Sequence, residues 1–314
     1  MKAVRCHEAG RIRVTDVPEP SGDGIDVRVR AAGICGSDLH LLAAGVPLPG
    51  TLGHELAGTL ADGTPVAIEP LAPCGTCTAC RSGRYNLCSE GPAMIFGIGR
   101  DGGMAEKVRV PKSALVPLPA GVDVSNACLV EPLAVAIHGM RRAGVRPGER
   151  VAVVGGGTIG LVAVAAARAA GAEADLVARH DVQRVAGDRL GAGIAKDDRQ
   201  YDAVVDAVGT SEAVERAIAL ASPGGRLILL GSYWDGMRVP GFALCIKEID
   251  VFPASLYARE GGSRDVDAAA ALLAREPEIP RAIITHRFPL EAAEEAFRVA
   301  ADRKAGAIKV VLEP

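Results

Sequence analysis

A glycine-rich turn between two apolar segments is the feature that most restricts how this chain can fold. Residues 151–154 form a continuous apolar run, residues 155–160 read Gly-Gly-Gly-Thr-Ile-Gly, and an alanine-rich helical segment follows over 159–170. A short buried strand that leads through glycines into a helix is typical of the first βα unit of a parallel sheet. The pattern therefore predicts an α/β domain in the middle of the chain.

The same alternation continues downstream. Strands are predicted over 174–178, 203–206 and 226–230, and helices over 182–190 and 211–220, with a Ser-Pro-Gly-Gly turn at 222–225. This order predicts a doubly wound parallel sheet, the Rossmann arrangement. Further elements follow after about Ser255: helices over 265–273 and 290–301, and strands over 285–288 and 307–312. The sequence leaves open whether they extend this sheet or return to the N-terminal part.

The N-terminal part has a different character. Residues 1–14 and 25–31 alternate apolar and polar side chains, which indicates half-buried strands in an antiparallel, barrel-like region. Short strands separated by glycine and proline continue to about Pro119. We therefore predict a dinucleotide-binding domain over 123–255, inserted into a β-rich domain made of 1–122 and 256–314.

The glycine turn also predicts a ligand. It matches G-x-G-x-x-G, and the residues expected to contact the ligand are Gly155, Gly157, Thr158, Ile159 and Gly160. Glycines allow a tight turn and a close approach of the backbone, and the amides at a helix N-terminus face a pyrophosphate. The context of strand, turn and helix therefore predicts a bound dinucleotide.

The end of the second strand discriminates between the two nicotinamide cofactors. An Asp or Glu there accepts hydrogen bonds from the ribose of NAD, whereas this chain has Ala178. Basic side chains lie nearby: Arg179, His180 and Arg184. A missing carboxylate and an added guanidinium suit a 2′-phosphate, so we predict a preference for NADP(H). NAD(H) stays open if Asp175 or Asp181 serves as the acid.

Four of the eight cysteines are crowded into one short segment. Cys74, Cys77, Cys80 and Cys88 form C-x2-C-x2-C-x7-C. Four thiolates suit a closed tetrahedral zinc site, which stabilises a fold and leaves no open position for chemistry. An iron–sulfur cluster is the alternative, but the proline that customarily follows the last cysteine of such sites is absent. We predict structural zinc.

Charge and cysteine usage exclude several classes of protein. The formal net charge is −3, without the positive excess needed to bind a nucleic-acid backbone. The longest apolar stretch, 160–167, is too short to cross a membrane. The first fourteen residues carry no signal peptide, so we predict reduced thiols and a cytoplasmic location. Three of the other four thiols are predicted to be buried: Cys6, Cys128 and Cys245.

Further candidate metal ligands lie before and after the cysteine segment 74–88. Cys35 lies in Gly-Ile-Cys-Gly-Ser-Asp-Leu-His, His54 and Glu55 lie in Gly-His-Glu, and Glu131 begins Glu-Pro-Leu-Ala-Val-Ala-Ile-His-Gly. Together with the cysteine segment and the glycine turn, these motifs resemble the zinc-containing medium-chain dehydrogenase/reductase family, closest to its polyol (sorbitol) and threonine dehydrogenase branch. The resemblance covers nearly the whole chain and implies a GroES-like catalytic domain beside the Rossmann domain.

The resemblance implies a catalytic zinc held by Cys35 and His54. It implies Glu55 and Glu131 as the third ligand or as the exchangeable partner of a bound water. Zinc with one thiolate, a neutral imidazole and one carboxylate is neutral, and a second carboxylate would weaken it as a Lewis acid. We therefore expect that Glu55 and Glu131 do not both bind tightly throughout the cycle.

The same resemblance implies a proton relay through Ser37 and His40, and hydride transfer between the nicotinamide and a secondary alcohol or ketone. A small polar substrate is expected, such as a polyol, sugar or amino alcohol, and a homodimer or homotetramer. One alternative is a reductase of a specialised biosynthetic ketone. Another is a non-catalytic NADP(H)-binding sensor or structural protein, against which the intact motifs argue. Tyr233 and Trp234 follow a strand and are further candidates for the pocket.

Overall fold

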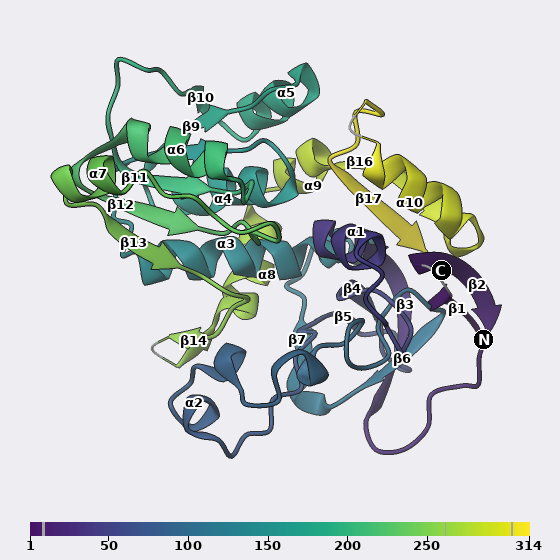
Figure 1. The fold of residues 1–314 in the computed structure, drawn as a ribbon. Coiled ribbons are helices and arrows are strands. Elements are labelled where there is room, and N and C mark those ends of the chain that lie inside the picture. The colour runs from purple at the N-terminus through teal and green to yellow at the C-terminus, as the bar shows by residue number, and fades with distance from the viewer. Residues whose placement is uncertain (8–9, 261, 303) are drawn as a thin grey trace. The chain divides into compact units, whose positions relative to one another are not determined.

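The computed structural model describes residues 1–7, 10–260, 262–302 and 304–314, and its chain forms two compact units (Figure 1). Unit 1 comprises Met1–Glu131, Ala258–Pro280 and Ile284–Pro314. Unit 2 comprises Pro132–Tyr257 and Arg281–Ile283. The two ends of the chain thus share one unit, and the middle of the chain forms most of the other. The units divide after Glu131 and Tyr257, whereas the sequence suggested 122 and 255.

Unit 1 is built on a seven-stranded sheet. Its order is β16-β17-β3-β4-β5-β7, with β6 paired to β3. The strands are β3 (Ile25–Gly33), β4 (Glu55–Thr59), β5 (Pro65–Ile68), β6 (Lys107–Val110), β7 (Leu115–Pro117), β16 (Ile284–Pro289) and β17 (Lys309–Glu313). Because β17 pairs antiparallel with β3, the C-terminal elements return to the N-terminal unit, which settles the question that the sequence left open.

Short elements surround this sheet. Strands β1 (Lys2–His7) and β2 (Arg11–Asp16) form an antiparallel hairpin, as do β14 (Arg259–Glu260) and β15 (Ser263–Arg264). The helices of this unit are α1 (Gly36–Ala43), α2 (Thr78–Arg81), α8 (Asp265–Arg275) and α10 (Ala293–Ala301). Short 3-10 turns lie at Tyr85–Leu87, Gly91–Met94, Lys112–Ala114, Val124–Leu129 and Leu290–Ala292.

The core of unit 1 follows the periodicity of its elements. On β3, Val27 and Val29 alternate with exposed residues and are buried. On α10, Ala293, Ala296 and Phe297 recur at helical spacing and enter the same cluster. Packing of one face of each element therefore fixes the strand register on which the candidate site depends.

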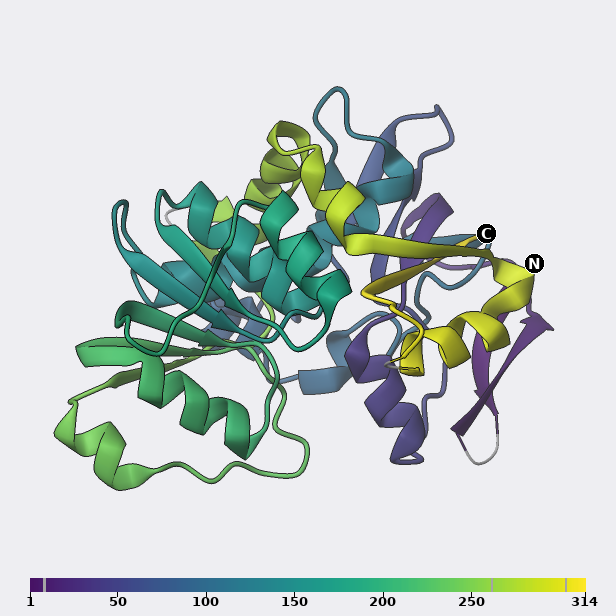
Figure 2. The same cartoon turned by 90° about the horizontal axis from the view of Figure 1, so that it is seen from above.

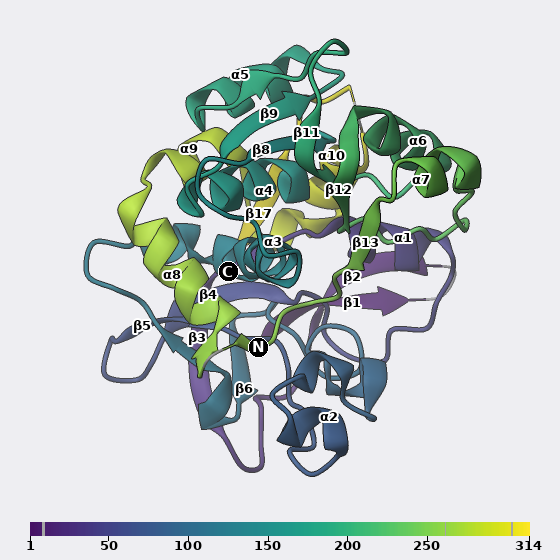
Figure 3. The ribbon, with the colours of Figure 1, turned by 90° about the vertical axis from the view of Figure 1, so that its left-hand side faces the viewer.

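Unit 2 contains a six-stranded parallel sheet in the order β10-β9-β8-β11-β12-β13. Its strands are β8 (Arg150–Val154), β9 (Glu173–Val177), β10 (Gly193–Ile194), β11 (Tyr201–Asp206), β12 (Ala221–Leu229) and β13 (Asp250–Pro253). Figure 3 shows β9, β8, β11, β12 and β13 side by side in that order. The strand order reverses direction between β8 and β11, as the doubly wound prediction requires.

Helices cover both faces of this sheet (Figure 2). They are α4 (Thr158–Ala169), α5 (Asp181–Arg189), α6 (Ser211–Leu220) and α7 (Gly241–Ile246), and α3 (Val130–Arg142) and α9 (Glu278–Ile283) cross the limits of the units. On β12, Leu227 and Leu229 pack into the cluster that contains α6, whereas Ile228 lies against Gly139 of α3. Two buried faces explain the continuous apolar runs that predicted these strands. Among the described helices, none combines the length and the apolar character needed to cross a membrane.

Three details differ from the sequence prediction. The predicted turn at 222–225 lies inside β12, where the pairing with β11 shifts register between Tyr201 and Ala203. Cys245 is exposed on α7 and Cys6 is half-buried in the first hairpin, so the prediction that they are buried was wrong. A small apolar residue on a short edge element has no periodicity that fixes its direction. Cys128 is buried, as predicted.

Candidate active site

Two neighbouring antiparallel strands bring Cys35, His54 and Glu55 together. Cys35 follows the end of β3 and caps α1, whereas His54 precedes β4, whose first residue Glu55 is opposite Gly33 of β3. One potential ligand atom from each of the three lies within 4.8 Å of the others. We call this group the Cys35 site. Glu131 is buried in the first turn of α3 and lies outside the described group.

The carboxylate of Asp38 faces the imidazole of His54. This carboxylate is fully buried, Oδ2 accepts a hydrogen bond from the Cys35 amide at 3.0 Å, and Oδ1 lies 3.5 Å from His54 Nδ1. Burial lowers the pKa of His54, but Asp38 and Cys35 outweigh it and hold that pKa well above its usual range. With Nδ1 directed at a carboxylate, Nε2 is the nitrogen left to bind a metal.

Lys309 and Gly33 fix the carboxylate of Glu55. Lys309 is the first residue of β17, is 2% exposed, and its Nζ donates to Glu55 Oε1 at 2.7 Å, to Glu55 Oε2 at 2.5 Å and to the Ile34 carbonyl at 2.8 Å. Burial opposes the charge of the ammonium, yet Glu55 and Cys35 raise the pKa of Lys309 above its ordinary value. A Cβ on Gly33 would lie 2.2 Å from Glu55 Oε2, so only glycine leaves room for the carboxylate.

The two predicted relay residues lie on α1. Ser37 Oγ is 3.4 Å from His54 Nε2, on the side of the imidazole that is open to a metal. His40 Nδ1 is 2.8 Å from the Gly36 carbonyl oxygen, so Nδ1 carries the proton in a neutral ring and Nε2 is the acceptor. Residues three apart on a helix are neighbours, and α1 therefore places both side chains along one row.

The donor set of the Cys35 site fits zinc. A thiol, an imidazole nitrogen and a carboxylate are the ligand types of catalytic zinc sites, which keep a fourth position for water or substrate. A buried aspartate behind the histidine is the usual second partner of such a ligand. His54 Nδ1 and Asp38 Oδ1 are both buried without a hydrogen bond. A metal bound to Nε2 would fix the imidazole with its Nδ1 facing Asp38.

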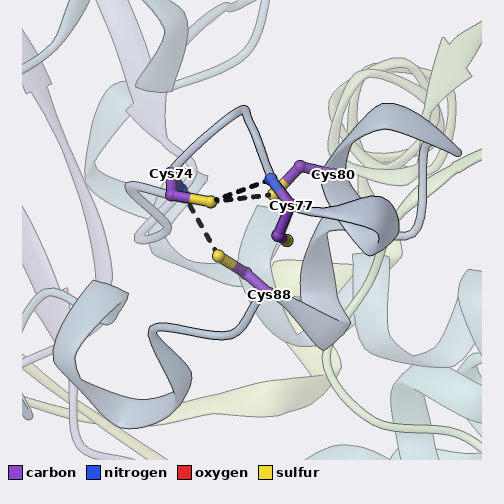
Figure 4. Close-up of side chains that lie close together, drawn as sticks. All are labelled: Cys74, Cys77, Cys80 and Cys88. Carbon is purple, nitrogen blue, oxygen red and sulfur yellow. Dashed lines mark hydrogen bonds between the residues drawn. The ribbon is translucent and has the colours of Figure 1, made fainter.

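The cysteine lobe, residues 74–88, forms the second group (Figure 4). All four sulfur atoms lie within 4.8 Å of one another, and Cys74 Sγ is 3.9 Å from Cys80 Sγ. Zinc–sulfur bonds of about 2.3 Å at tetrahedral angles require about 3.8 Å between sulfurs. The described thiols are free of disulfides, so the lobe also fits zinc.

Hydrogen bonds within this lobe stabilise the thiolate form of two of its cysteines. The Cys77 amide donates to Cys74 Sγ at 3.4 Å, and the Thr76 hydroxyl donates to the same sulfur at 3.6 Å. These bonds lower the pKa of Cys74 to about 5, whereas burial and the neighbouring thiols raise that of Cys80 to about 12. Hydrogen bonds from backbone amides also lower the pKa of Cys77 to about 7, so Cys74 and Cys77 favour the thiolate without a metal, whereas Cys80 needs a cation to ionise.

One buried carboxylate ties the lobe to the sheet. Glu69, 5% exposed and just beyond β5, accepts a hydrogen bond from the Tyr85 hydroxyl within the lobe. Arg264 Nη1 donates to Glu69 Oε2 at 2.9 Å and to the Ser113 carbonyl at 2.8 Å. Burial raises the pKa of Glu69 although Tyr85 and Arg264 both favour its charged form. The lobe is thus fastened at a point away from its sulfur atoms.

In unit 2, the glycine turn lies between β8 and α4, as predicted. Gly155 has a φ of 111°, and a Cβ there would lie 2.6 Å from Val208 Cγ2. A Cβ on Gly160 would lie 1.7 Å from the Gly155 carbonyl oxygen, which explains the last glycine of the motif. Gly157 caps α4, whose first residues are Thr158 and Ile159, so their amides point out of the helix N-terminus.

The end of β9 lies against this turn. A Cβ on Gly156 would lie 2.9 Å from Ala178 Cβ and 2.7 Å from Gln183 Cβ. Asp175 is buried within β9 and accepts hydrogen bonds from Arg199 at 3.0 Å and Tyr201 at 2.8 Å, so it is committed elsewhere. The alternative in which Asp175 binds a ribose therefore loses its support.

Three more predicted residues surround Ala178. Arg184 donates to the carbonyls of Ala178 and Arg179 at 3.0 and 3.1 Å, and it pairs with Asp181. His180 caps α5, and Arg179 and His180 are both exposed. Arg184 therefore holds this loop together, whereas Arg179 is exposed beside it.

Known proteins resemble the chain along its whole length. Residues 21–120 match the alcohol dehydrogenase GroES-like domain and residues 172–312 match the zinc-binding dehydrogenase family. Sorbitol dehydrogenase of Bacillus subtilis strain 168 is 30% identical over 100% of this chain and 97% of its own length, and that of Gallus gallus is 32% identical over 99% and 96%. The chain belongs to the zinc-containing medium-chain dehydrogenase/reductase family.

Solved structures agree with this assignment. A zinc-binding dehydrogenase of Sinorhizobium meliloti 1021, solved bound to NADP, is 31% identical with a TM-score of 0.87 and covers 100% of this dehydrogenase and 99% of its own chain. L-idonate 5-dehydrogenase of Escherichia coli K-12 is 28% identical with a TM-score of 0.87, over 100% and 99%. The predicted fold and the polyol dehydrogenase branch are confirmed.

Sequence reasoning missed four polar residues of this dehydrogenase. Asp38 was visible in the Cys-Gly-Ser-Asp motif, and Gln183 stands two residues into a predicted helix beside the glycine turn. Lys309 lies 254 residues from Glu55 along the chain, and no local pattern marks it. Asp206 ends a predicted strand, where polar side chains of parallel sheets commonly meet ligands.

Proposed function

We propose that this dehydrogenase transfers a hydride between NADP(H) and the secondary alcohol or ketone of a small polar substrate, such as a polyol, sugar or amino alcohol. In the oxidative direction the carbinol carbon loses a hydride to NADP+, the hydroxyl loses a proton, and a carbonyl forms. The observation that carries this proposal is the mixed set of Cys35, His54 and Glu55 within 4.8 Å, with the Ser37 hydroxyl beside His54.

When bound, zinc would supply a Lewis acid that polarises the substrate oxygen, and the nicotinamide would accept the hydride. Ser37 accepts the hydroxyl proton, and His40, which is exposed at the surface of α1, passes it toward solvent. A His40→Ala variant is expected to change the dependence of kcat on pH. An unchanged profile would remove His40 from the relay.

We propose that Glu55 is the resting third ligand and that Glu131 exchanges with it during the cycle. The buried charges of Lys309 and Asp38 cancel, so one thiolate and one carboxylate leave a zinc site near neutrality, and a second carboxylate would make it negative. Crystal structures with and without substrate that place both carboxylates at full ligand distance would contradict the exchange.

The preference for NADP(H) is supported by three features of unit 2. Ala178 faces the glycine turn in place of an acid, Asp175 is occupied by Arg199 and Tyr201, and Arg179 is exposed next to Ala178. A carboxylate would repel a 2′-phosphate, and a guanidinium binds it through two parallel hydrogen bonds.

Steady-state kinetics test the cofactor preference. We expect kcat/KM to be at least tenfold higher with NADP+ than with NAD+, and Ala178→Asp to reverse the order. Arg179→Ala should lower kcat/KM for NADP+ alone, by about tenfold. Arg189→Ala, which removes an exposed charge at the other end of α5, is the matched control. A clear preference of the wild type for NAD+ would refute this part of the proposal.

The substrate class is tested with zinc-loaded protein and a panel of polyols, sugars and amino alcohols, followed by absorbance of the reduced cofactor. We expect turnover of at least one secondary polyol. If zinc and cofactor bind and the whole panel is inert, a specialised biosynthetic ketone becomes the better assignment. Absence of turnover with every ketone as well would favour a sensor.

We also propose a homodimer or homotetramer in the cytoplasm. Edge strand β13 offers an unpaired side, and the adjacent α7 exposes Phe242 at 84% and Ile246 at 70%, both of which support burial against another copy. The free thiols support a reducing compartment. Light scattering of the purified protein tests the assembly, and a monomer at micromolar concentration would contradict it.

A further inference from the structure

The carboxylate of Asp206 joins two loops at one edge of the parallel sheet of unit 2. Asp206 is the last residue of β11 and is fully buried. Its Oδ1 accepts hydrogen bonds from the amides of Val208 at 2.8 Å and Gly209 at 3.2 Å, and its Oδ2 accepts one from the Tyr233 hydroxyl at 2.6 Å. The loop after β11 and the loop after β12 thus share one buried charge.

Tyr233 adopts a backbone conformation that disfavours a tyrosine. Its φ is 46°, in the left-handed region that bulky residues rarely occupy. Its hydroxyl is held by Asp206, and burial together with that carboxylate raises the pKa of Tyr233 above its ordinary value. Tyr233 therefore stays a hydrogen-bond donor, and its bond to Asp206 holds a strained turn in place.

The two loops are packed backbone to backbone. A Cβ on Gly231 would lie 2.3 Å from Gly209 Cα, and a Cβ on Gly209 would lie 2.8 Å from the Ser232 nitrogen. No side chain fits between them at these two positions. A change in one loop must therefore displace the other, since neither has room to yield.

These loops lie next to the glycine turn. Gly155 would meet Val208 and Ala207 if it carried a Cβ, so the loop after β11 touches the segment that receives the pyrophosphate. The Ala178 end of β9 lies on the other side of that turn, where the adenosine half belongs. In a doubly wound sheet a dinucleotide crosses the switch point with one half on each side, which leaves the nicotinamide half to the loops after β11 and β12.

We propose that the hydrogen bond between Asp206 and Tyr233 is a latch that preforms the surface for the nicotinamide half of the cofactor. The latch consists of Asp206 and Tyr233, both positioning residues, and it holds residues 231–234 against residues 207–209. The inference rests on the proposed function, because it requires that unit 2 bind a dinucleotide. A preformed loop avoids the entropy cost of ordering it on binding, so loss of the latch should weaken the intact cofactor and spare its adenosine half.

Unit 2 contains a matched control for this latch. Tyr201 also donates its hydroxyl to a buried aspartate, Asp175, at 2.8 Å, and its side chain is fully buried. Tyr201 begins β11 and Asp175 lies within β9, so this pair is not at the ends of β11 and β12 where the loops meet. Tyr201→Phe removes the same kind of bond without touching the two loops, and Arg199 still holds Asp175 in this variant.

Binding of NADPH is measured through the emission of Trp234, the one tryptophan of the chain, which is next to Tyr233 and 50% exposed. Binding of 2′,5′-ADP, the adenosine half, is measured by titration calorimetry, because that half lies away from Trp234. We expect Tyr233→Phe to raise the Kd of NADPH about tenfold or more, to leave the Kd of 2′,5′-ADP within about twofold, and Tyr201→Phe to change neither. Asp206→Asn, made with Tyr233 intact, should keep most of the NADPH affinity, because the side-chain amide can donate to the Tyr233 oxygen while its own oxygen keeps the two loop amides.

Tyr233→Gly is a second variant in case Tyr233→Phe misfolds, because glycine adopts the left-handed conformation without strain. It should weaken NADPH and spare 2′,5′-ADP in the same way. Equal weakening of both ligands by Tyr233→Phe, or wild-type NADPH affinity in both Tyr233 variants, would overturn the latch. If the wild type binds neither NADPH nor 2′,5′-ADP, the proposed function fails instead, and the two failures are therefore distinct.

Discussion

The Cys35 site and the cysteine lobe are both proposed to hold zinc, yet they are built in opposite ways. The lobe takes four identical ligands from one short segment and relies on its own amides and the Thr76 hydroxyl. The Cys35 site takes three different ligands, which lie in β4 or next to the ends of β3 and β4, and it is surrounded by buried charges, Asp38 on one side and Lys309 on the other. A closed site needs only geometry, whereas an open site must also balance charge so that the metal stays a Lewis acid.

The largest effect is expected from removing a ligand of the Cys35 site. His54→Ala should lower kcat by about a thousandfold or more, because the Lewis acid supplies several kcal/mol of transition-state stabilisation. Metal analysis should find about one zinc per chain instead of about two, with the lobe still filled. Cys6→Ala, which removes a half-buried thiol of the first hairpin, is the control. Loss of both zinc ions in His54→Ala would mean that the two sites are not independent.

Removing a ligand of the lobe should produce the reverse pattern. Cys88 is buried, and Cys88→Ala is expected to release the lobe zinc and lower the unfolding temperature by about 10 °C, as a structural metal does. At low temperature kcat should stay within about threefold of the wild type. Scanning calorimetry and initial rates measure the two quantities, and a large fall in kcat without a change in unfolding temperature would contradict a structural role.

Lys309→Met tests the charge balance of the Cys35 site. It leaves the buried Glu55 carboxylate without its cation, which should cost about 3 kcal/mol or more of the free energy of unfolding in metal-free protein. Zinc should restore part of the loss, because Glu55 would then pair with the metal. Lys2→Met removes the exposed pair with Glu291 and should change little. Equal stability of both variants would show that Lys309 does not compensate Glu55.

The smallest effect is expected at the anchor of the lobe. Tyr85→Phe removes the hydrogen bond to the buried Glu69 carboxylate and should cost about 1–2 kcal/mol, since Arg264 still pairs with Glu69. Unfolding measurements should detect it, and zinc content should be unchanged. Arg84→Ala, at the exposed neighbouring position, is the control. A loss of zinc in Tyr85→Phe would show that the anchor shapes the metal site.

The same contrast explains what could be predicted from the sequence. The cysteine lobe, the glycine turn and helix 211–220 depend on spacing within a few residues, and the structure places α6 at Ser211–Leu220. The doubly wound sheet followed from alternating apolar runs. These features are local, so the order of residues alone determines them.

Features that depend on long-range packing could not be predicted. Lys309 reaches Glu55 only because β17 pairs with β3, and no periodic pattern in the sequence predicts that pairing. The left-handed backbone at Tyr233 is held by a hydrogen bond from its hydroxyl to the buried Asp206, which lies at the end of another strand. A sequence pattern gives neither the partner nor the strain, because both arise when distant segments meet.

The 3.9 Å separation of Cys74 Sγ and Cys80 Sγ has a consequence for the lifetime of the protein. With zinc bound, both sulfurs would be coordinated and would be protected from an oxidant. Once the metal leaves, the low pKa of Cys74 supplies a reactive thiolate next to a partner, and closing a bond of about 2 Å needs only a small movement. Oxidative ageing of this dehydrogenase should therefore begin with metal loss from the lobe, and a disulfide there would bar zinc from returning.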